Sequence, residues 1–149
     1  MKRLKDIAMK NIAIVYYSGT GNTELLADAV REGVVSVGSS AKKISAGLFG
    51  ADMLDSYDAV AFGCPASGAE NLEEDIFEPM FETLLPYLAG KRIALFGSYG
   101  WGDGQWMRSW EQRVKEAGAT LVAKSIITMD SPDADALVQA REMGKALTA

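Results

Sequence analysis

Short apolar runs alternate with longer stretches in which apolar residues recur at helical spacing, from residue 11 to the C-terminus. The short runs predict strands, and the longer stretches between them predict helices. We expect strands at residues 11–17, 41–45, 58–63, 92–97 and 120–128. We expect helices at residues 22–37, 73–88, 105–117 and 132–147. This alternation predicts the α/β fold class, with a doubly wound, five-stranded parallel sheet and helices on both faces.

Several elements carry finer signals. The third and fourth strands are continuous apolar runs that end in glycine, which is typical of strands buried on both faces. The second strand is short and carries two lysines, so we expect it at the sheet edge. Pro79 and Pro86 are expected to kink or divide the second helix, and Pro132 is expected at the first position of the last helix. Residues 46–55 predict a short irregular helix.

Ligands of such sheets bind beyond the carboxyl ends of the strands. We therefore examine the first loop (residues 18–24), the second loop (residues 64–72) and the third loop (residues 98–105). The first loop combines glycines with Ser18, Thr20 and Thr23 ahead of a helix. Its backbone can approach a phosphate, its hydroxyls can donate, and the helix N-terminus adds partial positive charge. Since it contains no lysine or arginine, we expect a permanently bound phosphate.

Two common phosphate loops do not match the first loop. A Walker A loop requires a lysine where Asn22 stands, and a dinucleotide fingerprint requires a third glycine where Glu24 stands. An ordinary βα turn with a capped helix is the remaining alternative, because Ser, Thr and Asn are all good N-caps.

The other two loops suit a planar ring. The third loop and the residue before it place four glycines around Tyr99 and Trp101, and a stacked planar ligand explains such displayed aromatics better than core filling does. The second loop is built of small residues, and Gly68 can adopt the positive φ of a tight turn. A phosphate grip, an aromatic and a small-residue loop together describe a site for FMN, with adenine nucleotides still possible on geometry alone.

Composition excludes several function classes. The chain has no histidine and one cysteine, Cys64, which excludes Ser-His-Asp and Cys-His catalysis, iron–sulfur clusters and a structural zinc site. We expect no metal, and the absence of disulfides fits a reducing, cytoplasmic location. The chain contains no run of about 18 apolar residues, so we expect no membrane span. A net charge of −5 disfavours binding to nucleic acid.

The acidic residues are unevenly distributed. Residues 70–82 contain six carboxylates and no basic residue. The simplest interpretation is a solvated helix face, and the stretch gains importance if it borders a functional site. We expect one domain at residues 10–149, with residues 1–9 as an N-terminal extension.

Residues 10–149 resemble the flavodoxin family, specifically the short-chain type of anaerobic bacteria. The resemblance rests on the phosphate motif at residues 17–24, on residues 96–104, and on the pattern at residues 70–79. It implies the strand order 2-1-3-4-5, non-covalently bound FMN and low-potential transfer of single electrons between semiquinone and hydroquinone. It also implies a peptide flip at Gly68 on reduction. The implied cofactor-binding residues are Ser18, Gly19, Thr20, Gly21, Asn22, Thr23, Pro65, Ala66, Ser67, Gly68, Ala69, Glu70, Ser98, Tyr99, Gly100, Trp101, Gly102 and Asp130.

The implied roles differ among these residues. The first loop would hold the phosphate, Trp101 would stack on the outer face of the ring, and the second loop would line the inner face. Asp130 would reach the ribityl chain or cap the last helix. The carboxylates Glu70, Glu73, Glu74 and Glu78 would attract basic redox proteins to an otherwise monomeric carrier.

Three residues depart from the family pattern. Pro65 stands where a serine often adds a hydroxyl to the phosphate, Ser67 replaces a methionine on the inner face of the ring, and Ala69 replaces an acidic or amide residue. We expect weaker FMN binding as a result. The main alternative function is a small FMN-dependent quinone or azo reductase of the same fold. A receiver-type signalling domain is rejected, because Tyr17 and Cys64 stand near strand ends that would need acidic residues.

Overall fold

Apolar runs from both halves of the chain assemble into one parallel sheet. The computed structural model describes residues 9–149, so the predicted extension at residues 1–9 lies outside the described residues except for Met9. Within residues 9–149 the strand order is β2-β1-β3-β4-β5, and β6 also pairs with β4. The strands are β1 (Asn11–Tyr16), β2 (Ser40–Ser45), β3 (Ala59–Gly63), β4 (Arg92–Tyr99), β5 (Thr120–Leu121) and β6 (Ile126–Met129). The predicted fold class and strand order are confirmed.

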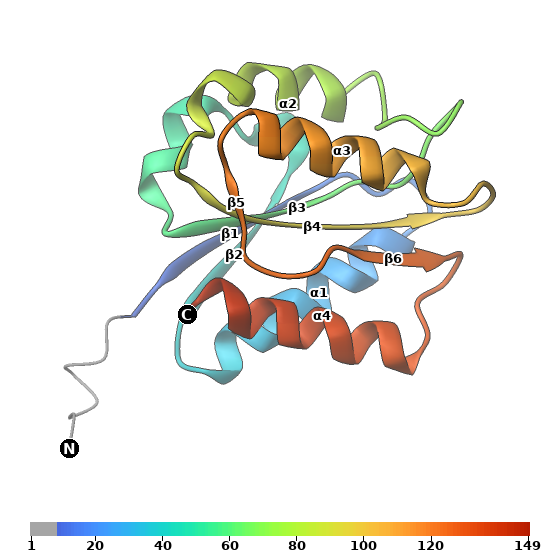
Figure 1. Ribbon diagram of the computed structural model, residues 1–149. Coiled ribbons are helices and arrows are strands. Elements are labelled where there is room, and N and C mark those ends of the chain that lie inside the picture. The colour runs from blue at the N-terminus through green and yellow to red at the C-terminus, as the bar shows by residue number, and fades with distance from the viewer. Residues whose placement is uncertain (1–8) are drawn as a thin grey trace.

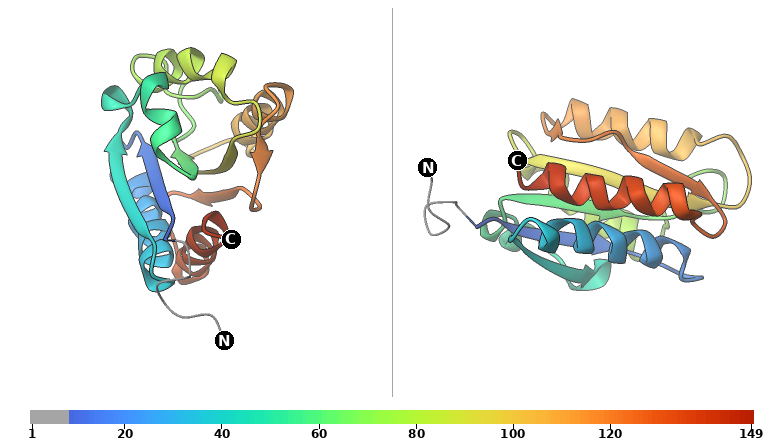
Figure 2. Two further views of the ribbon diagram at one scale, coloured as in Figure 1. Left: turned by 90° about the vertical axis from the view of Figure 1, so that its left-hand side faces the viewer. Right: turned by 90° about the horizontal axis from the view of Figure 1, so that it is seen from below.

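Helices cover both faces of this sheet. Figure 1 shows α2 and α3 above the sheet and α1 and α4 below it, and the views in Figure 2 agree. The helices are α1 (Asn22–Ser36), α2 (Phe77–Leu84), α3 (Gln105–Glu116) and α4 (Ala134–Leu147). Three short 3₁₀ helices accompany them, η2 (Ala46–Leu48), η3 (Ala51–Ser56) and η4 (Leu85–Tyr87). The irregular helix predicted at residues 46–55 is therefore present as η2 and η3.

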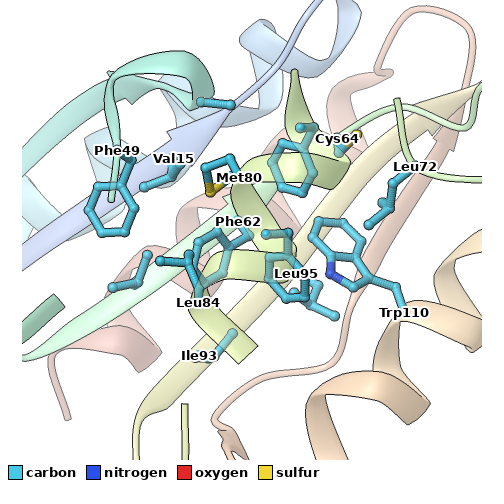
Figure 3. Close-up of a cluster of buried hydrophobic side chains, with 14 of the residues drawn as sticks. Val15, Phe49, Phe62, Cys64, Leu72, Met80, Leu84, Ile93, Leu95 and Trp110 are labelled. Carbon is cyan, nitrogen blue, oxygen red and sulfur yellow. The ribbon is translucent and has the colours of Figure 1, made fainter. Parts of the chain in front are cut away.

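The two faces of the sheet are packed by different side chains. Under α2 and α3 the core is aromatic. The centroids of the Phe62 and Phe81 rings lie 5.3 Å apart in an edge-to-face arrangement, and those of Trp110 and Phe81 lie 5.7 Å apart in the same arrangement. Figure 3 shows this cluster between the strands and the two helices. On the other face, Gly144 lets α4 pack closely against α1, because a Cβ at Gly144 would lie 2.1 Å from the Val30 carbonyl oxygen. Both arrangements hold the carboxyl ends of the strands in fixed positions.

The predicted fifth strand is two strands. Thr120 and Leu121 pair with Arg92 and Ile93, whereas residues 126–129 pair with residues 96–99. Between them the chain leaves the sheet edge, and the Ser125 hydroxyl donates to Glu111 on α3 at 2.7 Å. An edge strand has a neighbour on only one side, so a polar segment can leave it at little cost.

Two helix boundaries also differ from prediction. The second helix begins at Phe77 instead of residue 73, and Pro79 lies in its first turn, where no backbone donor is needed. Pro86 does divide the predicted helix, because η4 replaces α-helix there. The last helix begins at Ala134, since Asp133 caps it by accepting from the Ala136 N–H at 2.8 Å. Pro132 therefore precedes the cap.

Candidate functional site

The carboxyl ends of β1, β3, β4 and β6 meet at one edge of the sheet, on the right of Figure 1. The loops that follow them surround a cleft of about 340 Å³. Its lining residues are Tyr17, Ser18, Gly19, Thr20, Asn22, Thr23, Pro65, Ala66, Ser67, Glu73, Ser98, Tyr99, Gly100 and Asp130. The lining includes no lysine or arginine, so any negative charge in this cleft is held by backbone dipoles and hydroxyl groups.

The first loop is a turn closed by a serine hydroxyl, and two of its N–H groups have no acceptor within residues 9–149. The Ser18 hydroxyl oxygen accepts from the N–H groups of Gly21, which is the N-cap of α1, and of Glu24 in its first turn, at 3.1 and 3.2 Å. Within the described chain, the N–H groups of Thr20 and Asn22 donate to no protein acceptor. These residues line the cleft at the N-terminus of α1, so their donors are available to a phosphate.

A buried hydroxyl pair joins the first loop to the third. Thr23 is 1% exposed and its Oγ1 lies 2.9 Å from the Oγ of Ser98, which is 5% exposed. The Ser98 N–H also donates to the Thr23 hydroxyl oxygen, at 3.3 Å. This pair fixes the end of β4 against the first turn of α1, so this end of the cleft is held in place by the protein itself.

The second loop makes a tight turn at the mouth of the cleft. Ser67 and Asn71 exchange two backbone hydrogen bonds, at 2.7 and 2.9 Å, and enclose three residues. Gly68 has φ 55 and Glu70 has φ 56, so two of these residues are left-handed. Gly68 adopts this conformation without steric cost, whereas Glu70 adopts one that non-glycine residues seldom visit.

The third loop is fixed at its base and exposed at its tip. At the base, the Trp106 indole donates to the Cys64 carbonyl at 3.2 Å and lies 5.3 Å from the Tyr99 ring. At the tip, Trp101 is 63% exposed. An exposed indole beside a cleft provides a large apolar face for a ligand or partner.

Glu70 connects the second loop to the third. Its carboxylate accepts from the Asp103 N–H at 3.0 Å. Gly102 makes room for this contact, because a Cβ there would lie 1.8 Å from the Glu70 Oε1 atom. The tips of the two loops are therefore joined by one half-buried side chain.

Glu73 lies inside the cleft and is 8% exposed. Its carboxylate accepts from the N–H groups of Asp75, Ile76 and Phe77, each at 2.8 Å. Burial alone would raise the pKa of the Glu73 carboxyl, but these three donors outweigh it and hold the pKa below its ordinary value. Glu73 therefore stays charged and anchors the start of α2.

The sequence and the fold match known proteins. The flavodoxin family model matches residues 14–144. The curated flavodoxin of Megasphaera elsdenii is 41% identical over 135 residues, covering 91% of this chain and 96% of its own length. The flavodoxin of Clostridium beijerinckii is 43% identical over 120 residues, covering 80% of this chain and 87% of its own. This chain belongs to the flavodoxin family.

Solved structures agree with that assignment. The solution structure of two-electron reduced Megasphaera elsdenii flavodoxin superposes with a TM-score of 0.84 and 39% identity, covering 92% of this chain and 98% of the other. A flavodoxin from the domain Archaea superposes with a TM-score of 0.81 and 27% identity, covering 93% and 96% of the two chains. As a flavodoxin, this chain is an FMN-dependent electron-transfer protein that passes electrons to redox partner proteins. Its family membership favours this function over the reductase alternative.

Sequence reasoning located most of the cleft but not all of it. Most of the residues that the flavodoxin motifs implied line the cleft; Gly21, Gly68, Ala69, Glu70, Trp101 and Gly102 lie outside its lining. Tyr17 and Glu73 line the cleft and were not in the predicted site. Tyr17 could have been found, because it is the residue directly before the first loop. Asp130 lines the cleft and does not cap α4, since Asp133 has that role.

The predicted acidic docking edge requires a correction. Glu73 is buried and bound to backbone donors, so it cannot be one of its exposed carboxylates. Glu78 is half-buried and forms a two-bond ion pair with Arg113, at 2.7 and 2.8 Å. Glu74, Asp75 and Glu82 are exposed. The exposed negative charge of residues 70–82 therefore comes from fewer side chains than the sequence suggested.

Cys64 has a structural environment. It is fully buried at the end of β3, and its sulfur accepts from the Glu73 N–H at 3.3 Å. Burial raises the pKa of the Cys64 thiol, so the side chain stays protonated. Residues 9–149 contain no group of three His, Cys, Asp or Glu side chains arranged to hold a metal. The described helices are all too short or too polar to cross a membrane.

Proposed function

We propose that this flavodoxin holds FMN in the cleft with the phosphate at the first loop and the ring between the second and third loops. The convergence of these loops on one cleft without a basic lining residue is the observation that carries the proposal. The proposed binding residues are those implied by the family motifs (Ser18, Gly19, Thr20, Gly21, Asn22, Thr23, Pro65, Ala66, Ser67, Gly68, Ala69, Glu70, Ser98, Tyr99, Gly100, Trp101, Gly102 and Asp130), to which we add Tyr17 and Glu73. When bound, FMN supplies a ring that accepts and returns electrons one at a time.

The residues present fit the phosphate group of this cofactor. The free N–H groups of Thr20 and Asn22 lie at the N-terminus of α1, where the helix dipole favours an anion. The hydroxyl of Thr20 is exposed and bound to no other group of the described chain. Because no ammonium or guanidinium group is present in the lining, hydrogen bonds and dipoles would neutralise the phosphate.

The residues at the ring end fit a planar group. Trp101 is exposed and follows Gly100, which lines the cleft, while Tyr99 lines it from the same loop and Ser67 from the opposite one. Around Gly68 no heavy atom lies within 4 Å of the Cβ position, and its φ is 55. Glycine reaches this positive φ and the negative φ region at similar steric cost, which supports Gly68 as the residue that turns when the redox state changes.

Charge in the cleft supports a low potential. Glu73 contributes a buried carboxylate, Asp130 contributes a second acidic side chain, and no lining residue is basic. The protein environment therefore disfavours additional negative charge at this site. We infer that the last electron to enter is released readily to a partner.

The exposed carboxylates nearest the second loop provide a docking charge. Glu74 and Asp75 lie between that loop and α2, and Glu82 lies further along the helix. We propose that they attract basic redox proteins, with Glu70 and Glu78 contributing from partly buried positions. The transfer rate should fall as ionic strength rises, and stopped-flow measurements at several salt concentrations test this. A rate independent of salt would contradict this docking proposal.

The remaining parts of the proposal concern the whole chain. We propose that residues 10–149 act as one domain, that residues 1–9 are an extension, and that the protein is a cytoplasmic monomer. The single buried cysteine supports a reducing compartment. Light scattering on the FMN-loaded protein measures its mass directly, and a mass twice that of the chain would contradict the monomer.

An anaerobic reductive titration of the FMN-loaded protein tests the electron-transfer function. We expect a broad long-wavelength absorbance band that rises as the first electron enters and falls as the second enters. Passage to the fully reduced form without that band would contradict one-electron transfer. Steady oxidation of NADH or NADPH by the purified protein would instead support the reductase. A variant changed far from the loops should behave like the wild type. Glu82→Gln alters one exposed carboxylate outside the three loops, so its titration should show the same rise and fall of the band.

A further inference from the structure

A lysine lies behind the first loop, although the loop itself contains none. Lys43, on β2, reaches α1 and pairs with Glu24 at 3.0 Å and with Asp28. Its side chain is 19% exposed, and its ammonium group lies 5.3 Å from the centre of the Tyr16 ring. The Tyr16 hydroxyl also donates to Glu24, at 3.1 Å. The carboxylate of Glu24 therefore has two donors from neighbouring strands.

Glu24 occupies a position that competes with a bound phosphate. It lies in the first turn of α1, next to Thr23, and its backbone N–H is bound by Ser18. Tyr17 and Ser18 line both the cleft and a neighbouring hollow that Glu24 also lines. The carboxylate is thus close to the same helix N-terminus that favours an anion in the cleft. Uncompensated, its charge would repel a phosphate there.

We infer that Lys43 is a positioning residue for the phosphate, which it favours by holding the Glu24 carboxylate away from the cleft and cancelling its charge. The inference rests on the proposed phosphate site. This role explains why the first loop can contain the acidic Glu24 without a basic residue. The compensating cation is Lys43 on β2, which lies outside the cleft lining. Asp28 fixes the ammonium group from one helical turn further along.

The local electrostatics agree with this role. Bonds to Lys43 and Tyr16 hold the pKa of the Glu24 carboxyl below its ordinary value, so the group is ionised wherever a phosphate would bind. Burial would lower the pKa of Lys43, but its bonds to Asp28 and Glu24 raise it instead. Removing Lys43 would therefore leave a charged carboxylate behind the first loop, not a neutral one.

Comparing FMN with riboflavin isolates the phosphate, because riboflavin carries the same ring and ribityl chain without it. Dissociation constants of both ligands would be measured by fluorescence quenching on the apoprotein for wild type, Lys43→Gln, Glu24→Gln and the double variant. We expect Lys43→Gln to weaken FMN binding about two- to fivefold at low salt while riboflavin binding is unchanged. The double variant lacks both the Lys43 and the Glu24 charge. Its ratio of FMN to riboflavin dissociation constants should therefore lie within about twofold of the wild-type ratio. Lys43→Arg, which keeps the charge, should also preserve the ratio.

The outcomes separate this inference from the proposed function. If wild type binds FMN and riboflavin equally, the phosphate site itself is contradicted. If wild type prefers FMN and Lys43→Gln retains that preference, only the role of Lys43 is contradicted. An equal loss for both ligands would show that the residue supports the fold alone, and urea midpoints of each apoprotein identify that case. A loss confined to FMN that shrinks as salt is added supports the inference.

Discussion

The two ends of the cleft are built differently. At the phosphate end, formed by the first loop, Ser18 caps two N–H groups and the buried Thr23–Ser98 pair ties the loop to β4. At the ring end, formed by the second and third loops, the joining contact above the cleft is the bond from the Asp103 N–H to Glu70. Gly68, Glu70, Gly102 and Gly104 all have positive φ there. The first loop is tied to the sheet by a buried hydroxyl pair. The second and third loops are joined at their bases by the Ala66 N–H to Ser98 carbonyl bond and by the Trp106 indole, whereas their tips are joined by one exposed side-chain bond.

This difference suits an electron carrier. A phosphate stays in place through every redox step, so preformed, buried donors lower the entropic cost of holding it. The ring end must accommodate changes in charge and the approach of partners, and exposed loops with glycine turns change conformation at low cost. We therefore expect substitutions of buried groups that tie the loops to the sheet, such as Thr23, to affect the fold and the ligand together. Substitutions at the loop tips of the ring end should affect the ligand with little effect on the fold.

Thr23→Val should have the largest effect. The variant keeps the shape of the side chain but leaves the Ser98 hydroxyl and N–H without their partner in a buried position. We expect a loss of about 2 kcal/mol in the free energy of unfolding, together with weaker FMN binding. Urea unfolding of the apoprotein and titration with FMN measure the two effects.

Thr20→Val is the matched control at the same end. Thr20 is exposed and also lines the cleft, so its loss should weaken FMN binding while changing the free energy of unfolding by less than about 0.5 kcal/mol. Equal stability of the two variants would show that the buried pair does not fix the phosphate end.

Glu73→Gln tests the anchor behind the ring end. Loss of the charge weakens three hydrogen bonds at the start of α2, so we expect a loss of about 1–2 kcal/mol near neutral pH. Because the pKa of Glu73 is lower in the folded protein, its contribution is complete above the ordinary value of 4.5 and is lost as pH falls through the folded value. Acid titrations of stability should be flatter below pH 4.5 in the variant than in wild type. The exposed neighbour Glu74, changed to Gln, should leave the curve unaltered, and a steep acid loss that persists in Glu73→Gln would assign it to other groups.

Glu70→Ala should separate ligand from fold most clearly. It removes the acceptor of a solvent-exposed hydrogen bond from the Asp103 N–H, so the free energy of unfolding should change by less than about 0.5 kcal/mol. We expect FMN to dissociate about two- to tenfold faster, as the loss of one hydrogen bond between the loops predicts. Glu70→Gln keeps an acceptor oxygen and should dissociate at nearly the wild-type rate. Stopped-flow dissociation measures both variants, and an unchanged rate in Glu70→Ala would mean that this bond does not close the ring end.

The sequence predicted the fold well because its signals are redundant. Apolar runs, glycine strand ends and helical spacing all point to the same alternation, and the strand order followed from the family resemblance. The errors lie where one local signal competes with tertiary contacts. Residues 73–76 have helical composition, yet the Glu73 carboxylate binds their N–H groups and delays the helix until Phe77. The last strand breaks at Ser125, whose hydroxyl bonds to α3.

The site was predicted unevenly for the same reason. The first loop could be predicted directly, because the hydroxyl and free N–H groups that suit a phosphate come from consecutive residues of one short segment. The role of Glu73 could not be read in this way: among six carboxylates in one stretch, only packing selects the one that turns inward. Lys43 was likewise read as an edge-strand residue, since nothing in a strand sequence shows which helix a side chain will reach.

Ser67→Met should have the smallest effect and sharpens the comparison in the opposite direction. Ser67 lines the cleft, and a longer apolar side chain there would cover more of the ring, so we expect FMN to bind about threefold more tightly. Asn71→Met is the matched control, because Asn71 is exposed at the other end of the same turn and belongs neither to the lining nor to the proposed binding residues. Its affinity should equal that of wild type when both variants are titrated with FMN. If Ser67→Met binds no more tightly, the ring end is limited by the ordering of its loops and not by missing contact area. In that case loop-closing contacts such as that of Glu70 determine the affinity at this end.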